Sequence, residues 1–468
     1  MANAVDMLVR GTLALATSLA LGYYTQRIRI AHGSTTARLY TLLQLTQFHI
    51  PYYASRTLPN TFALVLTTLA NAAFLPGGYP STGIVLLTVT AVVFRAEVAV
   101  LLAFYAAHLL FARRVCLPKL LASGAAGGIV GLAATLTVDS FFWQSSPPIF
   151  STPGLGRWHW LWPEASAFYF NAVQGHASEW GTQPAHYYFS TCLPKLLLNP
   201  VTLLTLPTAL AVARRASGAL LLPNLWFVST YSLLVAHKEW RFVIYAVPPL
   251  THLSALGGAW LWTRRHKAAV PALAGLALAA SLAVSMVAAG GMLALSSTNY
   301  PGGAALSRLP RHLPAGAGNR TRVWMDVETC MTGASLFLQD SVVGGDKGAP
   351  TVEWDKTEDA VVLQTGKFWQ GVDFAIAADP ESVRARGRGA FEVVDVVYAF
   401  GGVKILRSDR HAPKAGKAEE AGAATGQTAA GWRGWRQDGF GIGLGRGRQL
   451  RIDMKEALWI LRRRPVTE

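Results

Sequence analysis

Long apolar stretches recur through the first two-thirds of the chain, and most have about the length of a membrane-crossing helix. Such a helix needs about 20 mostly apolar residues. The sequence predicts candidate spans at 7–24, 40–54, 59–75, 83–94, 98–112, 120–138, 187–212, 219–236, 242–262 and 269–295. Four of these are short, and they form two neighbouring pairs: 40–54 with 59–75, and 83–94 with 98–112. Each pair predicts either a tight helical hairpin or one broken span.

The composition supports a membrane protein. Of the 468 residues, 51% are hydrophobic and only 15% are charged, whereas a soluble chain usually carries about 25% charged residues. The formal net charge of +16 is typical of nucleic-acid binding in a soluble protein. Here many basic residues lie in short loops between apolar runs, a pattern that membrane topology explains better. We therefore expect a membrane partner and no nucleic acid.

Four basic clusters predict the orientation in the membrane. They are Arg27, Arg29 and Arg38; Arg113, Arg114 and Lys119; Arg214 and Arg215; and Arg264, Arg265 and Lys267. Lys and Arg in short loops favour the cytosolic side. With all four clusters in the cytosol, an even number of spans separates each from the next, so the assignment is self-consistent.

The opposite face is predicted to be lumenal. It receives Arg56, the aromatic loop 139–186, the charged segment 237–241 and the tail 298–468. Asn319 begins a glycosylation sequon, which suits a lumenal tail. The same count places Met1 in the lumen, so we expect a further helix upstream of it.

The chain is thus predicted to form two domains. Residues 1–297 form an all-α multi-pass membrane bundle, and residues 298–468 form a smaller α/β lumenal domain. Runs rich in β-forming residues predict strands; they lie at 321–327, 360–364, 391–399 and 402–406. The stretch 409–431 is rich in Ala, Gly, Lys and Glu, which predicts a flexible insertion.

The segment His237-Lys238-Glu239-Trp240-Arg241-Phe242 concentrates ionisable groups where two spans meet. Charged groups at such depth tend to be functional, and Arg or Lys is a natural partner for a phosphate. The structural alternative is an interfacial turn whose charges reach water. Arg95 and Glu97 interrupt an apolar stretch on the same predicted face, and Arg56 lies there too. For Arg95, Glu97 and Arg56, the sequence is equally compatible with a purely structural role, such as an ion pair, and with a phosphate site.

The loop 139–186 carries many aromatic residues, which commonly lie at the membrane interface. Trp180 is one of them, and some could stack on sugars. Asp139 ends a span on the lumenal side. The histidines show no metal-ligand spacing, and Cys116, Cys192 and Cys330 form no metal or disulfide pattern. We expect no metal.

These segments together resemble a known family. His237-Lys238-Glu239-Trp240-Arg241-Phe242 resembles the HKExRF signature of the dolichyl-phosphate-mannose-dependent mannosyltransferases, glycosyltransferase family twenty-two. Similar matches occur along nearly the whole chain. They are Ser55-Arg56-Thr57-Leu58-Pro59-Asn60, Phe94-Arg95-Ala96-Glu97, Val138-Asp139-Ser140-Phe141-Phe142-Trp143, Trp162-Pro163-Glu164 and Trp180-Gly181-Thr182-Gln183-Pro184.

Two tail motifs, Asn299-Tyr300-Pro301-Gly302-Gly303 and Met331-Thr332-Gly333 with Asp326-Val327 before it, resemble the α-1,6 branch of that family, which adds the eighth mannose to the N-glycan precursor. The resemblance implies a GT-C type bundle in the endoplasmic reticulum membrane. It implies an inverting enzyme without metal or cofactor, with dolichyl-phosphate-mannose as donor and a lipid-linked oligosaccharide as acceptor. It also implies an essential acid in a first lumenal loop, which we expect upstream of Met1.

From these observations we expect four groups near the donor phosphate: His237, Lys238, Arg241 and Arg95. Asp139 and Glu239 are the candidate catalytic acids within the chain. Arg56, Glu97 and Trp180 are candidates for substrate binding. Three alternatives remain: an α-1,2-mannosyltransferase acting on the N-glycan precursor or a GPI lipid, a membrane transporter, and a non-catalytic remnant.

Overall fold

Proline starts many of the helices of this chain. The helices α4 (Pro59–Phe74), α5 (Pro80–Val93), α8 (Pro163–Phe168) and α10 (Pro200–Val212) each have proline in their first turn. There the missing N–H has no intrahelical partner to lose, and the fixed φ angle suits a helix. Proline therefore sets where these apolar segments begin.

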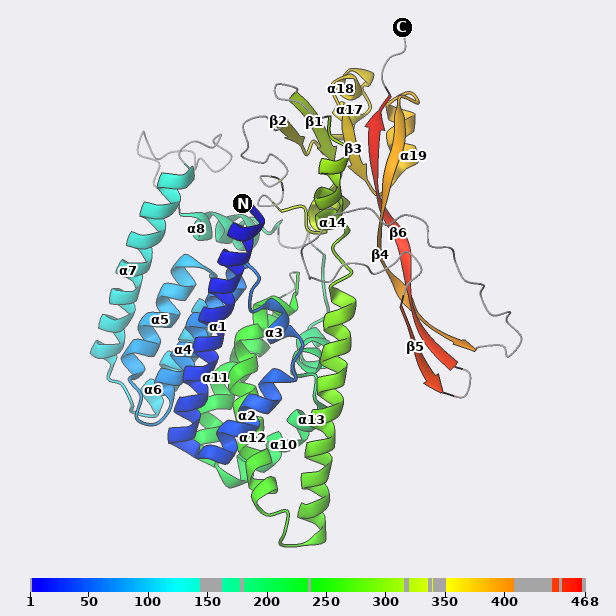
Figure 1. Cartoon of the computed structure of the whole chain (residues 1–468). Helices are drawn as coiled ribbons and strands as arrows, with labels where there is room; N and C mark the ends of the chain where they lie inside the picture. Colours follow the sequence, from blue (N-terminus) through cyan, green and yellow to red (C-terminus); the bar gives the residue numbers. More distant parts are fainter. Residues whose placement is uncertain are drawn as a thin grey trace. The chain divides into compact units, whose positions relative to one another are not determined.

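The computed structural model describes residues 2–143, 162–176, 181–234, 237–314, 320–335, 339, 351–407, 440–445 and 448–464. The chain divides into two units (Figure 1), one of Leu8–Leu293 and one of Ala294–Glu468 with Met1–Met7. The remaining helices of the first unit are α1 (Ala2–His32), α2 (Ser34–Leu45), α3 (His49–Tyr53), α6 (Val98–Phe111), α7 (Leu117–Trp143), α9 (Leu193–Leu197), α11 (Arg214–Leu233), α12 (Val247–Thr263) and α13 (Ala269–Ser296).

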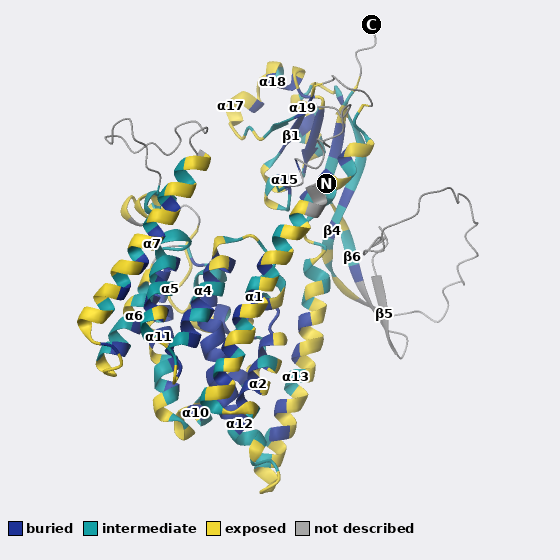
Figure 2. Cartoon of the chain, turned by 60° about the vertical axis from the view of Figure 1, so that its left-hand side comes forward, coloured by how far each residue is buried: buried dark blue, intermediate teal, exposed yellow. Residues whose placement is uncertain are grey.

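The first unit is built around α12. In the described part of the chain four helical segments are long and apolar enough to cross a membrane: Val5–His32, Leu117–Phe142, Trp240–Thr263 and Ala269–Ser296. The segment containing α12 is 94% buried, whereas the other three are 17% to 22% buried. Figure 2 shows this contrast between the buried α12 and the largely exposed α7 and α13. Apolar surface that is exposed over a span's length is what a lipid-facing helix presents.

Three predicted spans are broken in the structure. The span at 40–54 is two helices, α2 and α3. The span at 187–212 bends by 102° between Leu197 and Pro200, where Leu198 has a positive φ of 58°. The span at 242–262 starts as a 3₁₀ helix, Trp240–Ala246, and becomes α-helical at Val247. In each case the hydropathy is continuous while the backbone geometry is not.

The second unit is a mixed sheet with short helices, as predicted. Its strands are β1 (Arg320–Met325), β2 (Thr351–Asp355), β3 (Phe374–Ala377), β4 (Phe391–Arg407), β5 (Phe440–Gly445) and β6 (Arg448–Arg463). Their order is β2-β1-β3-β6-β4, with β5 also pairing with β6. β1 runs parallel to β2 and β3, whereas β6 runs antiparallel to its partners. The helices are α14 (Pro301–Arg308), α15 (Val327–Met331), α17 (Ala360–Leu363), α18 (Gly366–Gln370) and α19 (Pro380–Arg386).

Two strand predictions in this unit need correction. The run at 360–364 is the helix α17, because the Asp359 side chain accepts hydrogen bonds from the backbone N–H groups of Val361 and Val362 and caps the helix. The runs at 391–399 and 402–406 form the single strand β4, with a register shift between Phe400 and Gly402. The predicted insertion 409–431 and the sequon residue Asn319 lie outside the described residues.

The two tail motifs meet in this unit. The backbone N–H of Gly302 donates to the Thr332 hydroxyl oxygen over 3.0 Å, and that of Gly303 donates to the Thr332 carbonyl over 3.2 Å. A Cβ atom at Gly302 would lie only 2.1 Å from the carbonyl oxygen of Thr329. The close approach requires glycine, so these motifs have a packing role.

Candidate active site

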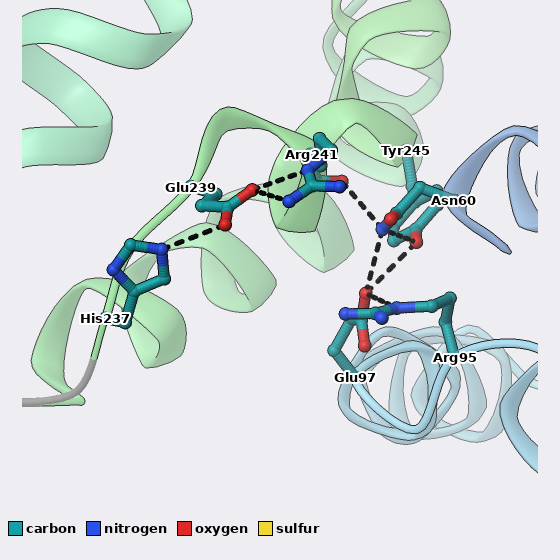
Figure 3. Close-up of polar contacts among 7 residues, drawn as sticks. All are labelled: Asn60, Arg95, Glu97, His237, Glu239, Arg241 and Tyr245. Atoms are coloured by element: carbon teal, nitrogen blue, oxygen red, sulfur yellow. Dashed lines mark hydrogen bonds and ion pairs between the residues drawn. The ribbon is translucent and has the colours of Figure 1, made fainter. Parts of the chain in front are cut away.

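Three segments that are far apart in the sequence meet at one end of the membrane unit. They are the first turn of α4, the connection between α5 and α6, and the segment 237–245 that leads into α12. Figure 3 shows the side chains that connect them. The contacts form two clusters, one around Glu97 and one around Glu239.

Glu97 is the centre of the first cluster. Its Oε1 accepts hydrogen bonds from Arg95 Nε at 2.7 Å, from the Tyr245 hydroxyl at 3.1 Å and from Asn60 Nδ2 at 3.2 Å. The Glu97 side chain is 7% exposed, whereas that of Arg95 is 26% exposed. A buried carboxylate needs such partners. The cluster therefore holds Arg95 in place and leaves part of its guanidinium open to solvent.

Glu239 is the centre of the second cluster. It forms an ion pair with Arg241 and accepts a hydrogen bond from His237 Nε2 at 2.9 Å. Partial burial raises the pKa of Glu239, but the His237 hydrogen bond and the Arg241 charge outweigh that effect and hold the pKa below its ordinary value. Glu239 is thus an ionised carboxylate that orients two neighbours.

Asn60 joins the two clusters. Its Nδ2 lies 2.8 Å from the Tyr245 hydroxyl and 3.3 Å from the backbone oxygen of Arg241. The ring of Phe242 lies 5.3 Å from the Arg95 guanidinium carbon, close enough for a cation–π contact. The two arginines are therefore fixed on neighbouring parts of one network.

Lys238 points elsewhere. Its amino group donates to the backbone oxygens of Gln183 and Leu234, and the residue is 3% exposed. An ammonium group has three donors, so two are used by the backbone. In this arrangement Lys238 ties the segment containing Gln183 to the end of α11.

Glu164 is the carboxylate that the sequence reasoning did not assign to the site. Burial raises its pKa to about 7, in opposition to the nearby Arg95 charge, and the charges of Glu97 and Asp139 add to the increase. Its carboxyl group also accepts a hydrogen bond from the backbone of Ala96. Glu164 therefore lies beside the Arg95 and Glu97 pair and can exchange a proton near neutral pH.

The other predicted residues lie as follows. Asp139, near the end of α7, accepts a hydrogen bond from Thr135 and reaches the network only through its repulsion of Glu164. The Arg56 guanidinium lies over the ring of Tyr52, with the guanidinium carbon 4.6 Å from its centre. Trp180 is outside the described residues. The assignments of Arg56 and Trp180 to substrate stay predictions.

The sequence reasoning also did not identify Asn60 and Tyr245 as members of the site. Asn60 ends the segment Ser55-Arg56-Thr57-Leu58-Pro59-Asn60, which drew attention only to its arginine. Tyr245 lies four residues after Arg241, within an apolar run. A buried hydroxyl and a buried amide need hydrogen-bond partners, so a polar residue in such a run is the signal that could have indicated them.

The network leaves cationic donors for an anionic ligand. In the described part of the chain, Arg95 uses only Nε for a hydrogen bond, and Arg241 uses Nε and one terminal nitrogen. A guanidinium has five donors and can bind a phosphate through two of them. The arrangement can thus hold a phosphate, with a proton acceptor, Glu164, nearby.

The chain is similar in sequence to one protein family and to individual yeast proteins. The Alg9-like mannosyltransferase family matches residues 2–306. A probable Dol-P-Man:Man(7)GlcNAc(2)-PP-Dol alpha-1,6-mannosyltransferase of Schizosaccharomyces pombe is 33% identical over 80% of this chain and 62% of its own length. The Saccharomyces cerevisiae enzyme of that name is 33% identical over 80% of this chain and 68% of its own length. The chain thus spans about two-thirds of the length of these relatives.

The structure of ArnT from Cupriavidus metallidurans resembles the chain in fold. The apo form has a TM-score of 0.52 at 14% identity, and the form bound to undecaprenyl phosphate has a TM-score of 0.53 at 15% identity. Each covers 83% of this chain and 82% of ArnT. The predicted GT-C type fold is therefore confirmed at the level of the overall fold. The family model covers the whole of the membrane unit, and relatives that are 33% identical match 80% of the chain. The chain therefore belongs to the Alg9-like mannosyltransferase family.

Proposed function

We propose that this protein transfers mannose from dolichyl-phosphate-mannose to the lipid-linked N-glycan precursor, forming an α-1,6 linkage that adds the eighth mannose. The α-1,6 linkage is proposed because relatives with that activity in their names match more of the chain than relatives named for an α-1,2 linkage. Relatives named for this α-1,6 activity match 71% to 80% of the chain, whereas GPI alpha-1,2-mannosyltransferase 3 of Danio rerio matches 44%.

The proposed reaction is an inverting displacement. The bond between the anomeric carbon of mannose and the phosphate oxygen breaks, and a bond to the acceptor's six-hydroxyl oxygen forms. Dolichyl phosphate leaves, and the hydroxyl proton passes to a base. The transition state has oxocarbenium character. Cations aimed at the leaving phosphate stabilise the charge that develops there.

Arg95 and Arg241 are the proposed phosphate ligands. Their partners Glu97 and Glu239 hold them in fixed positions, so little reorganisation is needed when the donor binds. His237 in turn holds Glu239 in position through its hydrogen bond to the Glu239 carboxylate. Lys238 acts indirectly in this proposal, because its amino group is bonded to the backbone.

Glu164 is the proposed proton acceptor supplied by this chain. A base is most effective when its pKa lies near the working pH, and Glu164, with a pKa of about 7, meets that condition. Glu239 is a poorer base because its pKa is lowered. Asp139, at the end of α7, tunes Glu164 by repulsion.

The site is proposed to face the lumen of the endoplasmic reticulum. The test is expression of the chain in microsomes that lack their own α-1,6 activity and accumulate the heptamannosyl precursor. We expect conversion to the octamannosyl product, with the new mannose released by an α-1,6-specific mannosidase. Release by an α-1,2-specific mannosidase would instead indicate the other branch of the family.

Arg241→Ala is the matched loss-of-function variant, and Arg264→Ala is its control. Both remove one guanidinium from the same unit, but Arg264 lies over the ring of Trp260 at the end of α12, away from the network. We expect only Arg241→Ala to abolish transfer. Retained transfer in Arg241→Ala would remove it from the phosphate role.

A further inference from the structure

A cavity with several basic lining residues lies in the membrane unit, away from the candidate active site. Its volume is about 990 Å³, within the range of ligand pockets. The basic residues that line it are His32, His108, Arg114, Arg214 and Arg215. Among its described lining residues none is acidic, so the cavity has a positive potential.

Three helices separate this cavity from the active-site network. α4 has Asn60 at its start and Phe74, a cavity residue, at its end. Its 16 residues span about 24 Å at about 1.5 Å per residue. α6 likewise follows Glu97 and contains the cavity residue Leu109 near its end, and α11 begins at the cavity residue Arg214 and ends at Leu233, five residues before Lys238. The cavity and the network are therefore at opposite ends of the bundle.

The arginines of the cavity differ in what they already contact. Arg114 donates to the backbone oxygen of Phe74, the last residue of α4, and a helix end is a favourable place for a cation. For Arg214 and Arg215, at the start of α11, the described chain provides no hydrogen-bond or ion-pair partner. Two guanidiniums are thus free beside a helix start, where backbone N–H groups also favour an anion.

An unpartnered buried donor supports a ligand at this place. Asn71 lines the cavity and is 3% exposed, and its Nδ2 has no hydrogen-bond partner among the described residues. The Tyr105 hydroxyl donates to Asn71 Oδ1 over 2.7 Å and accepts from Asn224 Nδ2 over 2.9 Å. The hydrogen bond from Tyr105 already uses the amide oxygen of Asn71, so the group of Asn71 without a partner is the donor Nδ2. A buried donor without a partner is costly, and an anionic oxygen would satisfy it.

We propose that this cavity is a binding site for a phosphate group. Free arginines, a helix start and the Asn71 donor are all suited to phosphate oxygens. The lining also includes Leu109 and Leu222, so an amphiphilic ligand fits better than a free anion. Basic pockets between membrane helices are typical sites for lipid headgroups. The ligand class is therefore a phosphate-bearing lipid, with free phosphate as the other source of the same chemistry.

The test is equilibrium binding of labelled dioctanoyl phosphatidic acid to the purified full chain in detergent. Arg214→Ala/Arg215→Ala removes two exposed groups, so we expect the fold to stay intact. Asn71→Leu removes the buried donor. A hydrogen bond to a charged group contributes enough for about tenfold in affinity, so we expect binding to weaken about tenfold in Asn71→Leu and further in the arginine variant.

The control is Arg264→Ala/Arg265→Ala. It removes the same charge from another basic cluster, where the guanidiniums lie over Trp260 and Trp262. Equal weakening by this control would show general surface attraction and overturn the site. Wild-type affinity in the arginine variant would overturn it as well, even if Asn71→Leu fails to fold. Displacement by millimolar inorganic phosphate would identify free phosphate as sufficient, and its failure to compete would identify the lipid.

Discussion

Glu97→Gln is the sharpest perturbation of the proposed mechanism. It keeps the size of the side chain and its acceptor oxygen while removing the negative charge. The oxygen can still accept from Tyr245 and Asn60, which donate to it over 3.1 and 3.2 Å. What is lost is the charge that holds the Arg95 guanidinium through the 2.7 Å contact. The variant therefore tests the positioning of Arg95 with little change in packing.

The magnitude follows from that one contact. A hydrogen bond between charged groups contributes about 1.5–3 kcal/mol and a neutral one about 0.5–1.5 kcal/mol. The difference is about 1–1.5 kcal/mol. If this energy is lost from the transition state, kcat falls about 5- to 12-fold, at about 1.4 kcal/mol per tenfold. Glu97→Ala also leaves the donors of Asn60 and Tyr245 unsatisfied in a buried site, so it should reduce the folded yield as well.

The assay is transfer of labelled mannose to the heptamannosyl acceptor in microsomes, with protein amounts matched by immunoblot. Thermal unfolding in detergent provides the stability control. We expect Glu97→Gln to lower kcat with a small change in unfolding temperature. Arg95→Lys in the same assay should be similarly impaired, because an ammonium cannot reproduce a guanidinium fork. Full activity of Glu97→Gln at wild-type stability would refute a role for the pair in positioning.

Three further outcomes are expected. In Glu164→Gln, transfer should fall at least 100-fold, and the activity of the wild type should rise with pH through about 7. Because the pKa of Glu164 is raised in the folded state, the wild type should lose stability as the pH rises from about 4.5 to 7, and the advantage of the variant in unfolding temperature should grow over that window. A pH-independent difference in unfolding temperature would contradict this. Lys238→Met should break the contact with Gln183 and lower kcat without changing the pH profile, whereas a shifted profile would indicate direct proton transfer. Gly302→Ala places a Cβ 2.1 Å from the Thr329 oxygen, so limited proteolysis should detect a loosened tail, and unchanged protection would contradict the packing role.

The sequence alone determined the membrane class and the position of the charged segments. Apolar runs of spanning length and basic clusters between them are local patterns, so hydropathy and charge are enough to read them. The same holds for the segment 237–242, whose charges stand out because their surroundings are apolar. The resemblance carried by these segments also indicated the family, which the comparisons confirm.

Which of these charges work together depends on how the helices pack. Glu97 and Asn60 are far from Tyr245 in sequence, and their hydrogen bonds exist because α4, α6 and the start of α12 meet at one end of the bundle. The direction of Lys238 onto backbone oxygens and the raised pKa of Glu164 depend on burial among neighbours that no local pattern specifies. Charge can be read from the chain, but its partners and its solvation are properties of the fold.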